Sequence, residues 1–394
     1  SGLELLHWVN PKGKKVFHVV QYQTEHTNSD TYCFTEPKRN MGIFNGILAG
    51  NCAEIGIPSN GYNSVKELYE IPEYDVENSP EIGLCSLAGI VISNVKDDKE
   101  YAKAAYYCLL MIHTAIHESE HEFPQVAYTA KARNSAGVGI LGLAHYMAKN
   151  KLSFMSQEGR NEIHKIAERH YYHLVNASLE LSKEFGIAKW MHKTKWPEGW
   201  LPIDTYNKNI DSIVTIDNQY DWEDLRNKIK SLGGLRFTSL MAIAPAESSS
   251  IACSLTNSIY PIRSLTLTKT SGDTTNKWVA PEATRLAKKY EIAWDIPNFD
   301  HIDVYALFQI FMDQTISSDL YSDRTKEVNI SMAQMFKELA YMAKMGVKTL
   351  YYHNSLTDSE ESTDFVNSSD KISEDVVDDI IDDEEGCGSG GCTL

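Results

Sequence analysis

The chain of 394 residues lacks the features of several protein classes. No apolar run approaches the roughly 18 residues needed to cross a membrane, and Ser1-Gly2-Leu3-Glu4 does not begin a signal peptide. Only seven cysteines occur, without zinc-ribbon spacing, which is typical of reduced thiols rather than a disulfide scaffold. No basic stripe with interleaved aromatic residues indicates direct nucleic-acid binding. We therefore expect a cytoplasmic protein that binds neither membrane nor nucleic acid.

The acidic residues are concentrated near the end of the chain. The formal net charge is −17, and the segment from Ser355 to Gly386 holds 13 acidic residues against the single base Lys371. Few aromatic residues and many Ser and Asp residues in this segment are typical of disorder. We therefore predict a folded body over residues 1–354 and a flexible acidic tail over 355–394.

Alternating helical and β-like segments indicate an α/β fold. Short strands and loops are expected over residues 1–60, and β-like runs at 238–243 and 347–352. Apolar residues at three- and four-residue spacing predict helices over 101–116, from about Ser135, and over 157–185, 222–232, 281–290, 302–314 and 331–345. No internal repeat interrupts this pattern.

Two short motifs match known patterns in an unsuitable context. Residues 117–121, HESEH, fit the zinc-protease pattern, but Pro124 follows at once and no third ligand is evident downstream. Residues 137–142, GVGILG, fit the dinucleotide pattern, but residues 129–135 do not predict the required preceding strand. We expect a polar helix end at the first motif and close helix packing at the second. A zinc metalloprotease using His117 and His121 remains an alternative function.

A set of motifs spread over the chain carries a more specific resemblance. In order they are GNCAEI at 50–55, EIGLCSL at 81–87, LPIDTY at 201–206, YDWE at 220–223, GLR at 234–236, APAESSS at 244–250, DQTIS at 313–317, GVKTLYY at 346–352 and GCGSGGCTL at 386–394. Together they resemble the C-terminal half of the large, catalytic subunit of class I ribonucleotide reductase. The resemblance implies the second half of a ten-stranded α/β barrel, with a finger loop carrying a radical cysteine and a disordered tail.

By this resemblance Cys52 carries the thiyl radical that abstracts the ribose 3′-hydrogen. A thiol suits this step because its S–H bond is weak enough to form a radical and strong enough to make the exchange reversible. Glu54 would accept the 3′-hydroxyl proton as a general base, and Cys85 would be one of two reducing thiols. The family has asparagine two positions before the radical cysteine, where Gly50 stands here, so Asn51 is the candidate for holding substrate hydroxyls.

Other residues would conduct the radical, bind phosphate and restore the thiols. Tyr351 and Tyr352 resemble the stacked tyrosines that relay the radical from a separate subunit, because a phenol can lose an electron and a proton together. Residues 246–249 (Ala246, Glu247, Ser248 and Ser249) resemble the loop that holds the substrate diphosphate at a helix N-terminus. Cys387 and Cys392 resemble the shuttle dithiol that thioredoxin or glutaredoxin recharges.

The resemblance also implies partners. The substrate would be a ribonucleoside diphosphate, and the radical would come from a metal-containing small subunit, with no metal or cofactor bound by this chain. Because the family chain is considerably longer, we expect the N-terminal half of the large subunit as a partner; a naturally split subunit, a fragment and a spliced product stay open. The tyrosine pair disfavours a glycyl-radical reductase. A non-catalytic assembly subunit of the same fold remains an alternative.

Overall fold

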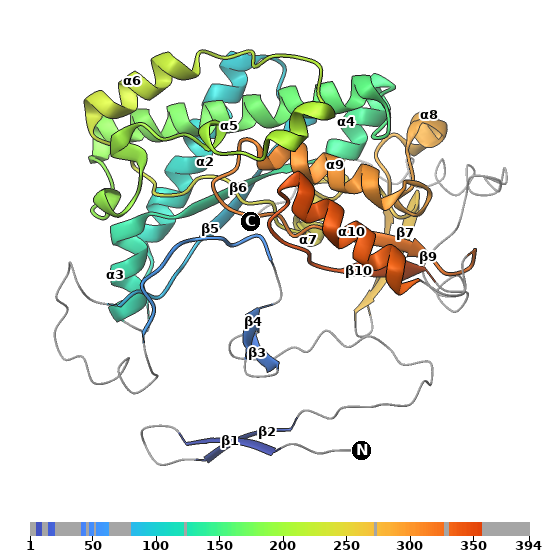
Figure 1. Cartoon of the computed structure of the whole chain (residues 1–394), viewed down its shortest axis with the longest axis horizontal. Helices are drawn as coiled ribbons and strands as arrows, with labels where there is room; N and C mark the ends of the chain where they lie inside the picture. The colour runs from blue at the N-terminus through green and yellow to red at the C-terminus, as the bar shows by residue number, and fades with distance from the viewer. Residues whose placement is uncertain are drawn as a thin grey trace, which may run out of the picture. The chain divides into compact units, whose positions relative to one another are not determined.

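The computed structural model describes residues 53–62, 80–121, 124–271, 274–326 and 331–356, and the backbone of four strands in the first 50 residues. Its contacts define two units, which are described separately. The first unit comprises Ser1–Asn51, Pro58–Gly83 and His121–Thr129. In it, β1 (Leu5–Val9) pairs antiparallel with β2 (Lys15–Val19), and β3 (Met41–Phe44) pairs antiparallel with β4 (Ile47–Gly50) (Figure 1). The short strands expected in residues 1–60 are therefore confirmed.

The second unit comprises Cys52–Ile57, Leu84–Glu120 and Ala130–Leu394, and a row of parallel strands and extended segments runs through it. β5 (Ser86–Val91) pairs in parallel with β6 (Ala136–Leu141) along its whole length. The segment 239–243 lies beside β6 through two backbone hydrogen bonds. At the end of that segment, Ile243 forms a parallel bridge to Ile316. Neighbours that all run in one direction require crossover connections, which the helices provide.

The row continues beyond Ile316 into β9 (Leu320–Asp323), which pairs in parallel with β10 (His353–Leu356). The strands β7 (Thr266–Ser271) and β8 (Thr274–Val279) form a separate antiparallel hairpin. The mixed α/β architecture is therefore confirmed. β10 ends at Leu356, and the remainder of the predicted tail lies outside the described residues.

Helices connect the strands and cover the row. They are α2 (Asp98–Glu118), α3 (Pro124–Arg133), α4 (Leu143–Asn150), α5 (Gln157–Phe185), α6 (Trp222–Leu232), α7 (Glu247–Ala252), α8 (Ala283–Leu286), α9 (Asn298–Gln309) and α10 (Met332–Met345). Short 3₁₀ turns lie at Ile92–Asn94, Met191–Lys193, Trp196–Glu198, Pro202–Asp204, Lys208–Ser212, Ala287–Lys289 and Ala293–Asp295.

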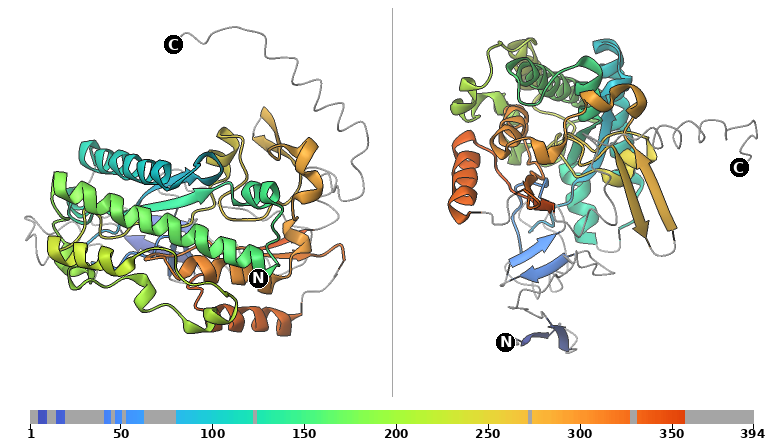
Figure 2. Two further views of the ribbon diagram at one scale, coloured as in Figure 1. Left: turned by 90° about the horizontal axis from the view of Figure 1, so that it is seen from above. Right: turned by 90° about the vertical axis from the view of Figure 1, so that its right-hand side faces the viewer.

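Local sequence explains where the clearest helices begin and end. Ser156 caps α5 by accepting a hydrogen bond from the Gly159 N–H, and Asp221 caps α6 in the same way. Helices α5 and α2 lie side by side (Figure 2). They run in the same direction, because Tyr101 near the start of α2 stacks with His173 in the middle of α5, while His113 farther along α2 packs on Phe185 at the end of α5.

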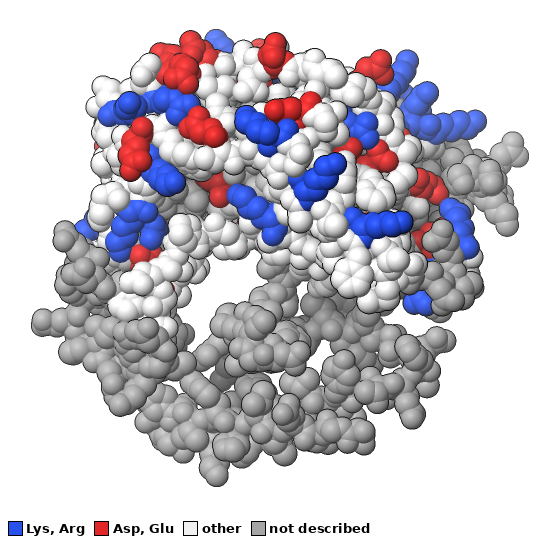
Figure 3. All heavy atoms as spheres, viewed as in Figure 1, with Lys and Arg blue, Asp and Glu red and all other residues white. Residues whose placement is uncertain are grey.

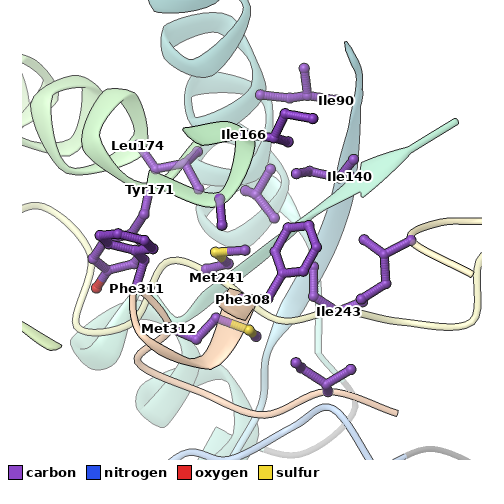
Figure 4. Close-up of a cluster of buried hydrophobic side chains, with 14 of the residues drawn as sticks. Ile90, Ile140, Ile166, Tyr171, Leu174, Met241, Ile243, Phe308, Phe311 and Met312 are labelled. Atoms are coloured by element: carbon purple, nitrogen blue, oxygen red, sulfur yellow. The ribbon is translucent and has the colours of Figure 1, made fainter. Parts of the chain in front are cut away.

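The hydrophobic core lies between the parallel row and the helices. Figure 4 shows side chains from β5, β6, α5, the segment 239–243 and α9 converging in one cluster. Its labelled members are Ile90, Ile140, Ile166, Tyr171, Leu174, Met241, Ile243, Phe308, Phe311 and Met312. All of them are buried, so the elements that carry the motifs share one close-packed interior.

Several predicted elements differ from the structure. The helix expected from Ser135 is wrong, because residues 136–141 form the fully buried strand β6 and α4 begins only at Leu143. The helix expected over 302–314 spans Asn298–Gln309, and the β-like run expected over 347–352 is wrong, because the strand β10 begins only at His353. The apolar spacing of a buried strand resembles that of a helix, and only its packing separates the two.

The described residues form no helix that could span a membrane, and on the face shown in Figure 3 they form no patch of a single charge sign. No described helix is long and apolar enough to cross a bilayer. On the face in Figure 3, acidic and basic side chains of the described residues are interspersed over the second unit.

Candidate active site

The loop that contains Glu54 is tied to the segment 315–317. Ser317 Oγ donates a hydrogen bond to Glu54 Oε2 at 2.6 Å and accepts one from the Ala53 N–H at 3.0 Å. Thr315 adds two bonds, from its N–H to the Glu54 carbonyl at 3.2 Å and from its Oγ1 to the Ala53 carbonyl at 2.7 Å. Glu54 is only 1% exposed. A buried carboxylate is tolerated when donors satisfy it, and Ser317 supplies one here.

Cys85 reaches the same segment through Gln314. The side-chain Nε2 of Gln314 donates to Cys85 Sγ at 3.4 Å and to the Ala136 carbonyl at 2.8 Å. Its Oε1 accepts a hydrogen bond from the Gly56 N–H at 3.3 Å. One amide therefore joins the Cys85 thiol to the loop that follows Cys52 in sequence.

The environment of Cys85 keeps it a thiol at neutral pH. Burial raises the pKa of Cys85 to about 12, the hydrogen bond from Gln314 opposes this shift, and the nearby carboxylates Asp313 and Glu54 add to it. Gly137 leaves the space for the sulfur, because a Cβ there would lie 3.0 Å from Cys85 Sγ. Cys85 is thus held as a thiol that can give up a hydrogen atom and not as a standing thiolate.

Asp313 fixes the backbone beside Gln314. Its carboxylate accepts hydrogen bonds from the Leu240 N–H at 2.7 Å, the Met241 N–H at 3.0 Å and the Tyr171 hydroxyl at 3.1 Å. Burial raises the pKa of Asp313 to about 6, against the effect of these donors. The buried carboxylate therefore links α5 and the segment 239–243 to the residue that contacts Cys85.

Tyr351 and Tyr352 lie against one another. Their ring centroids are 3.8 Å apart with an interplanar angle of 44°. The Tyr351 N–H donates to the Ser318 carbonyl, and the Leu320 N–H donates to the Tyr352 carbonyl, both at 2.8 Å. Tyr352 is 43% exposed. The pair is thus held beside the segment that also holds Glu54, with one ring reaching the surface.

The predicted phosphate segment starts a short helix. Ala246 is the N-cap of α7 and makes no side-chain capping bond, while Ser248 and Ser249 are exposed. Arg263 Nη1 lies 3.8 Å from Glu247 Oε1. This segment follows the C-terminal end of 239–243, whereas Cys85 directly precedes β5, so the two lie at opposite ends of the parallel row.

Residues 117–121 and 137–142, which fit the zinc-protease and dinucleotide patterns, form other structures. α2 ends at Glu118, so His121 lies outside the helix, and His117 Nε2 instead contacts Asn134 Oδ1 at 2.8 Å and Arg236 Nη2 at 2.7 Å. Gly137 and Gly139 lie inside β6 and not in a turn between strand and helix. The glycines let β6 approach Ala242 closely, so the helix packing expected for them is wrong.

Sequence reasoning missed the residues that connect the site. Gln314, Thr315 and Ser317 belong to a motif that carried the resemblance, but no role was predicted for them. The signal in the sequence that could have indicated them is the run of amide and hydroxyl side chains directly after Asp313. Asn51, Cys52, Cys387 and Cys392 lie outside the described residues, so their roles stay predictions.

Comparison with known proteins shows which family model and which relatives the chain matches. Residues 45–353 match the family model described as "Ribonucleotide reductase, barrel domain". A "Ribonucleoside-diphosphate reductase subunit alpha" from Buchnera aphidicola subsp. Schizaphis graminum is 32% identical over 346 residues, covering 87% of this chain and 43% of the relative. The "Ribonucleoside-diphosphate reductase 1 subunit alpha" of Escherichia coli K12 is 36% identical over 278 residues, 70% of this chain and 35% of the relative. The "Ribonucleoside-diphosphate reductase subunit alpha" of Enterobacteria phage T4 is 31% identical over 312 residues, covering 77% of this chain and 39% of the relative. The chain thus spans well under half the length of these relatives.

Proposed function

This chain belongs to the ribonucleotide reductase barrel-domain family, and on that premise we propose that it is the C-terminal part of a ribonucleoside-diphosphate reductase catalytic subunit. It would convert ribonucleotides to 2′-deoxyribonucleotides for DNA synthesis by thiyl-radical chemistry. Activity would require assembly with the N-terminal half of the large subunit and a radical-generating small subunit. The half-barrel with a finger loop belongs to the same proposal, and the parallel row of segments supports it.

One observation carries the proposal: a carboxylate and a thiol from separate motifs meet on one segment. Glu54 bonds to Ser317, and Cys85 bonds to Gln314 three positions earlier. Cys52 stands two residues before Glu54 in sequence. A general base, a reducing thiol and a radical thiol are the three groups that the proposed reaction needs near one ribose.

The proposed steps balance as follows. The Cys52 thiyl radical takes the ribose 3′-hydrogen, and the 3′-hydroxyl proton passes to Glu54 while the 2′-hydroxyl leaves as water. Two electrons and two protons come from the thiol of Cys85 and a second thiol on the N-terminal half, which form a disulfide. Glu54 then returns its proton to the 3′-oxygen and Cys52 returns the 3′-hydrogen, so that one of the two thiol protons leaves in the water and the other remains on C2′. The high pKa of Cys85 suits this role, because the protonated thiol still holds the hydrogen that it must give.

The remaining predicted residues complete the cycle. Tyr351 and Tyr352 would pass the radical inward from the metal-containing small subunit, and their contact at 3.8 Å supports such a relay. Residues 246–249 would bind the substrate diphosphate, with Asn51 contacting ribose hydroxyls. Cys387 and Cys392 would reduce the disulfide and be recharged by thioredoxin or glutaredoxin. We place this chemistry in the cytoplasm, where such reductants keep thiols reduced.

The test is deoxycytidine diphosphate formation from cytidine diphosphate, with dithiothreitol as reductant. The chain is assayed alone and then with its candidate N-terminal chain and small subunit. Cys52→Ala should abolish turnover, while Cys108→Ala, which changes a cysteine on α2, should retain it. Turnover in the full mixture only would support the proposal. A stable complex without turnover would instead establish the non-catalytic assembly subunit.

A further inference from the structure

Gln314 is the side chain on which the loop and the thiol meet, and its partners determine how its amide is oriented. The Ala136 carbonyl can only accept a hydrogen bond and the Gly56 N–H can only donate one. Nε2 must therefore face Ala136 at 2.8 Å and Oε1 must face Gly56 at 3.3 Å. The second hydrogen of Nε2 is then directed to Cys85 Sγ at 3.4 Å.

The backbone of Gln314 is held as firmly as its side chain. Its carbonyl accepts hydrogen bonds from Lys348 Nζ at 2.9 Å and from Gln309 Nε2 at 3.1 Å. Gln314 is itself 1% exposed. An amide with this many partners in a buried position cannot turn away without leaving buried polar groups unpaired, which is unfavourable.

We propose that Gln314 is a positioning residue that holds the Cys85 thiol and the loop segment 53–56 in one hydrogen-bonded unit. Its Nε2 orients the sulfur and favours the thiolate, while its Oε1 sets the position of the loop. The inference rests on the proposed function for its catalytic meaning only, because the reactivity of Cys85 can be measured without turnover.

The contact has a chemical consequence that packing alone would not produce. A hydrogen bond donated to sulfur stabilises the charged thiolate and so lowers the thiol pKa, against the effect of burial. For a thiol that titrates far above the working pH, each unit of further increase in pKa lowers the thiolate fraction, and the alkylation rate with it, about tenfold.

The experiment measures the alkylation rate of each cysteine by iodoacetamide from pH 8 to pH 10 in the full chain, resolved by peptide mass spectrometry. Gln314→Glu keeps an oxygen for Gly56 but replaces the donor with a negative charge. We expect alkylation of Cys85 to slow about tenfold, equivalent to about 1.4 kcal/mol. Gln314→Leu removes donor and acceptor, and we expect slowing of about three- to tenfold.

Two controls separate this role from general loosening. Cys108 is a second partly buried thiol whose pKa burial raises to about 11, and its rate should not change in any variant. Thr315→Val removes a different bond to the same loop and should leave the Cys85 rate unchanged. The proposal would be overturned if both Gln314 variants left the Cys85 rate within twofold of the native rate or raised it. It would also be overturned if Thr315→Val slowed the alkylation of Cys85 as much as the Gln314 variants do.

The outcome is separable from that of the turnover assay. Slower alkylation in the variants with no turnover in the native assembly would reject the proposed function and keep the positioning role. Unchanged alkylation in the variants with full turnover in the native assembly would reject the positioning role and keep the proposed function.

Discussion

Stability should fall as the pH rises through the titration of Asp313. The folded-state pKa is about 6 and the ordinary value is 3.8, because burial disfavours the carboxylate. The folded protein therefore binds this proton more tightly than the unfolded chain. The contribution to the free energy of unfolding is greatest below the unfolded pKa and is lost as the pH rises through about 6. A difference of about two pKa units corresponds to about 3 kcal/mol, of which about 2 kcal/mol falls between pH 4 and pH 7.

Asp313→Asn removes this titration and keeps one of the two oxygens, so either the Leu240 or the Met241 N–H loses its acceptor, a loss that does not depend on pH. Urea unfolding, followed by tryptophan fluorescence at several pH values between 4 and 7, gives the free energy of unfolding of both proteins. The native protein should lose about 2 kcal/mol relative to the variant across this range. Titrations of all other groups cancel in the difference when the substitution is local.

An exposed carboxylate provides the control. Asp224 lies on the surface of α6 and pairs with Lys228, so Asp224→Asn removes only an exposed ion pair and should change the free energy of unfolding by less than about 1 kcal/mol. A flat difference for Asp313→Asn, or one in which the native protein gains stability as the pH rises, would refute the account of the buried carboxylate.

Three further predictions concern packing, a buried acceptor and the tyrosine pair. Gly137→Val should lower the free energy of unfolding by about 1–3 kcal/mol in urea unfolding, because a Cβ at this position would lie 2.6 Å from Leu87 Cδ2. Glu168→Ala should cost about 2–4 kcal/mol by the same measurement, because its buried carboxylate accepts from Trp222 Nε1 and two backbone N–H groups. Tyr351→Phe should abolish turnover of the full assembly while leaving the melting temperature unchanged, because a phenyl ring packs alike but cannot carry the radical.

Each of these has a matched comparison. Gly61→Ala should be nearly neutral, since a Cβ at this position would meet nothing within 4 Å, and equal losses at both glycines would contradict the packing argument. Glu180→Ala removes only an exposed pair with Lys183, so a loss as large as that of Glu168→Ala would contradict the role of burial. Turnover by Tyr351→Phe would reject the relay.

The elements that sequence predicted best are those whose signals are local. The predicted bounds of α5 and α6 match the structure because Ser156 and Asp221 cap them from within one turn. The strand β6 was missed because its character depends on neighbours. Gly137 and Gly139 resemble helix-packing residues until β5 and the segment 239–243 are placed on either side.

The amino-acid sequence was sufficient to list the chemical groups of the protein and, through the order of its motifs, to predict its family. It predicted roles for Glu54, Cys85 and the tyrosine pair, because the chemistry of a side chain follows from the residue type alone. That Glu54 and Cys85 both bond to the segment 313–317 became visible only in the folded chain. Gln314 lies 229 positions from Cys85 and 258 from Gly56, and hydrogen bonds across such separations form only after distant strands have packed into one core.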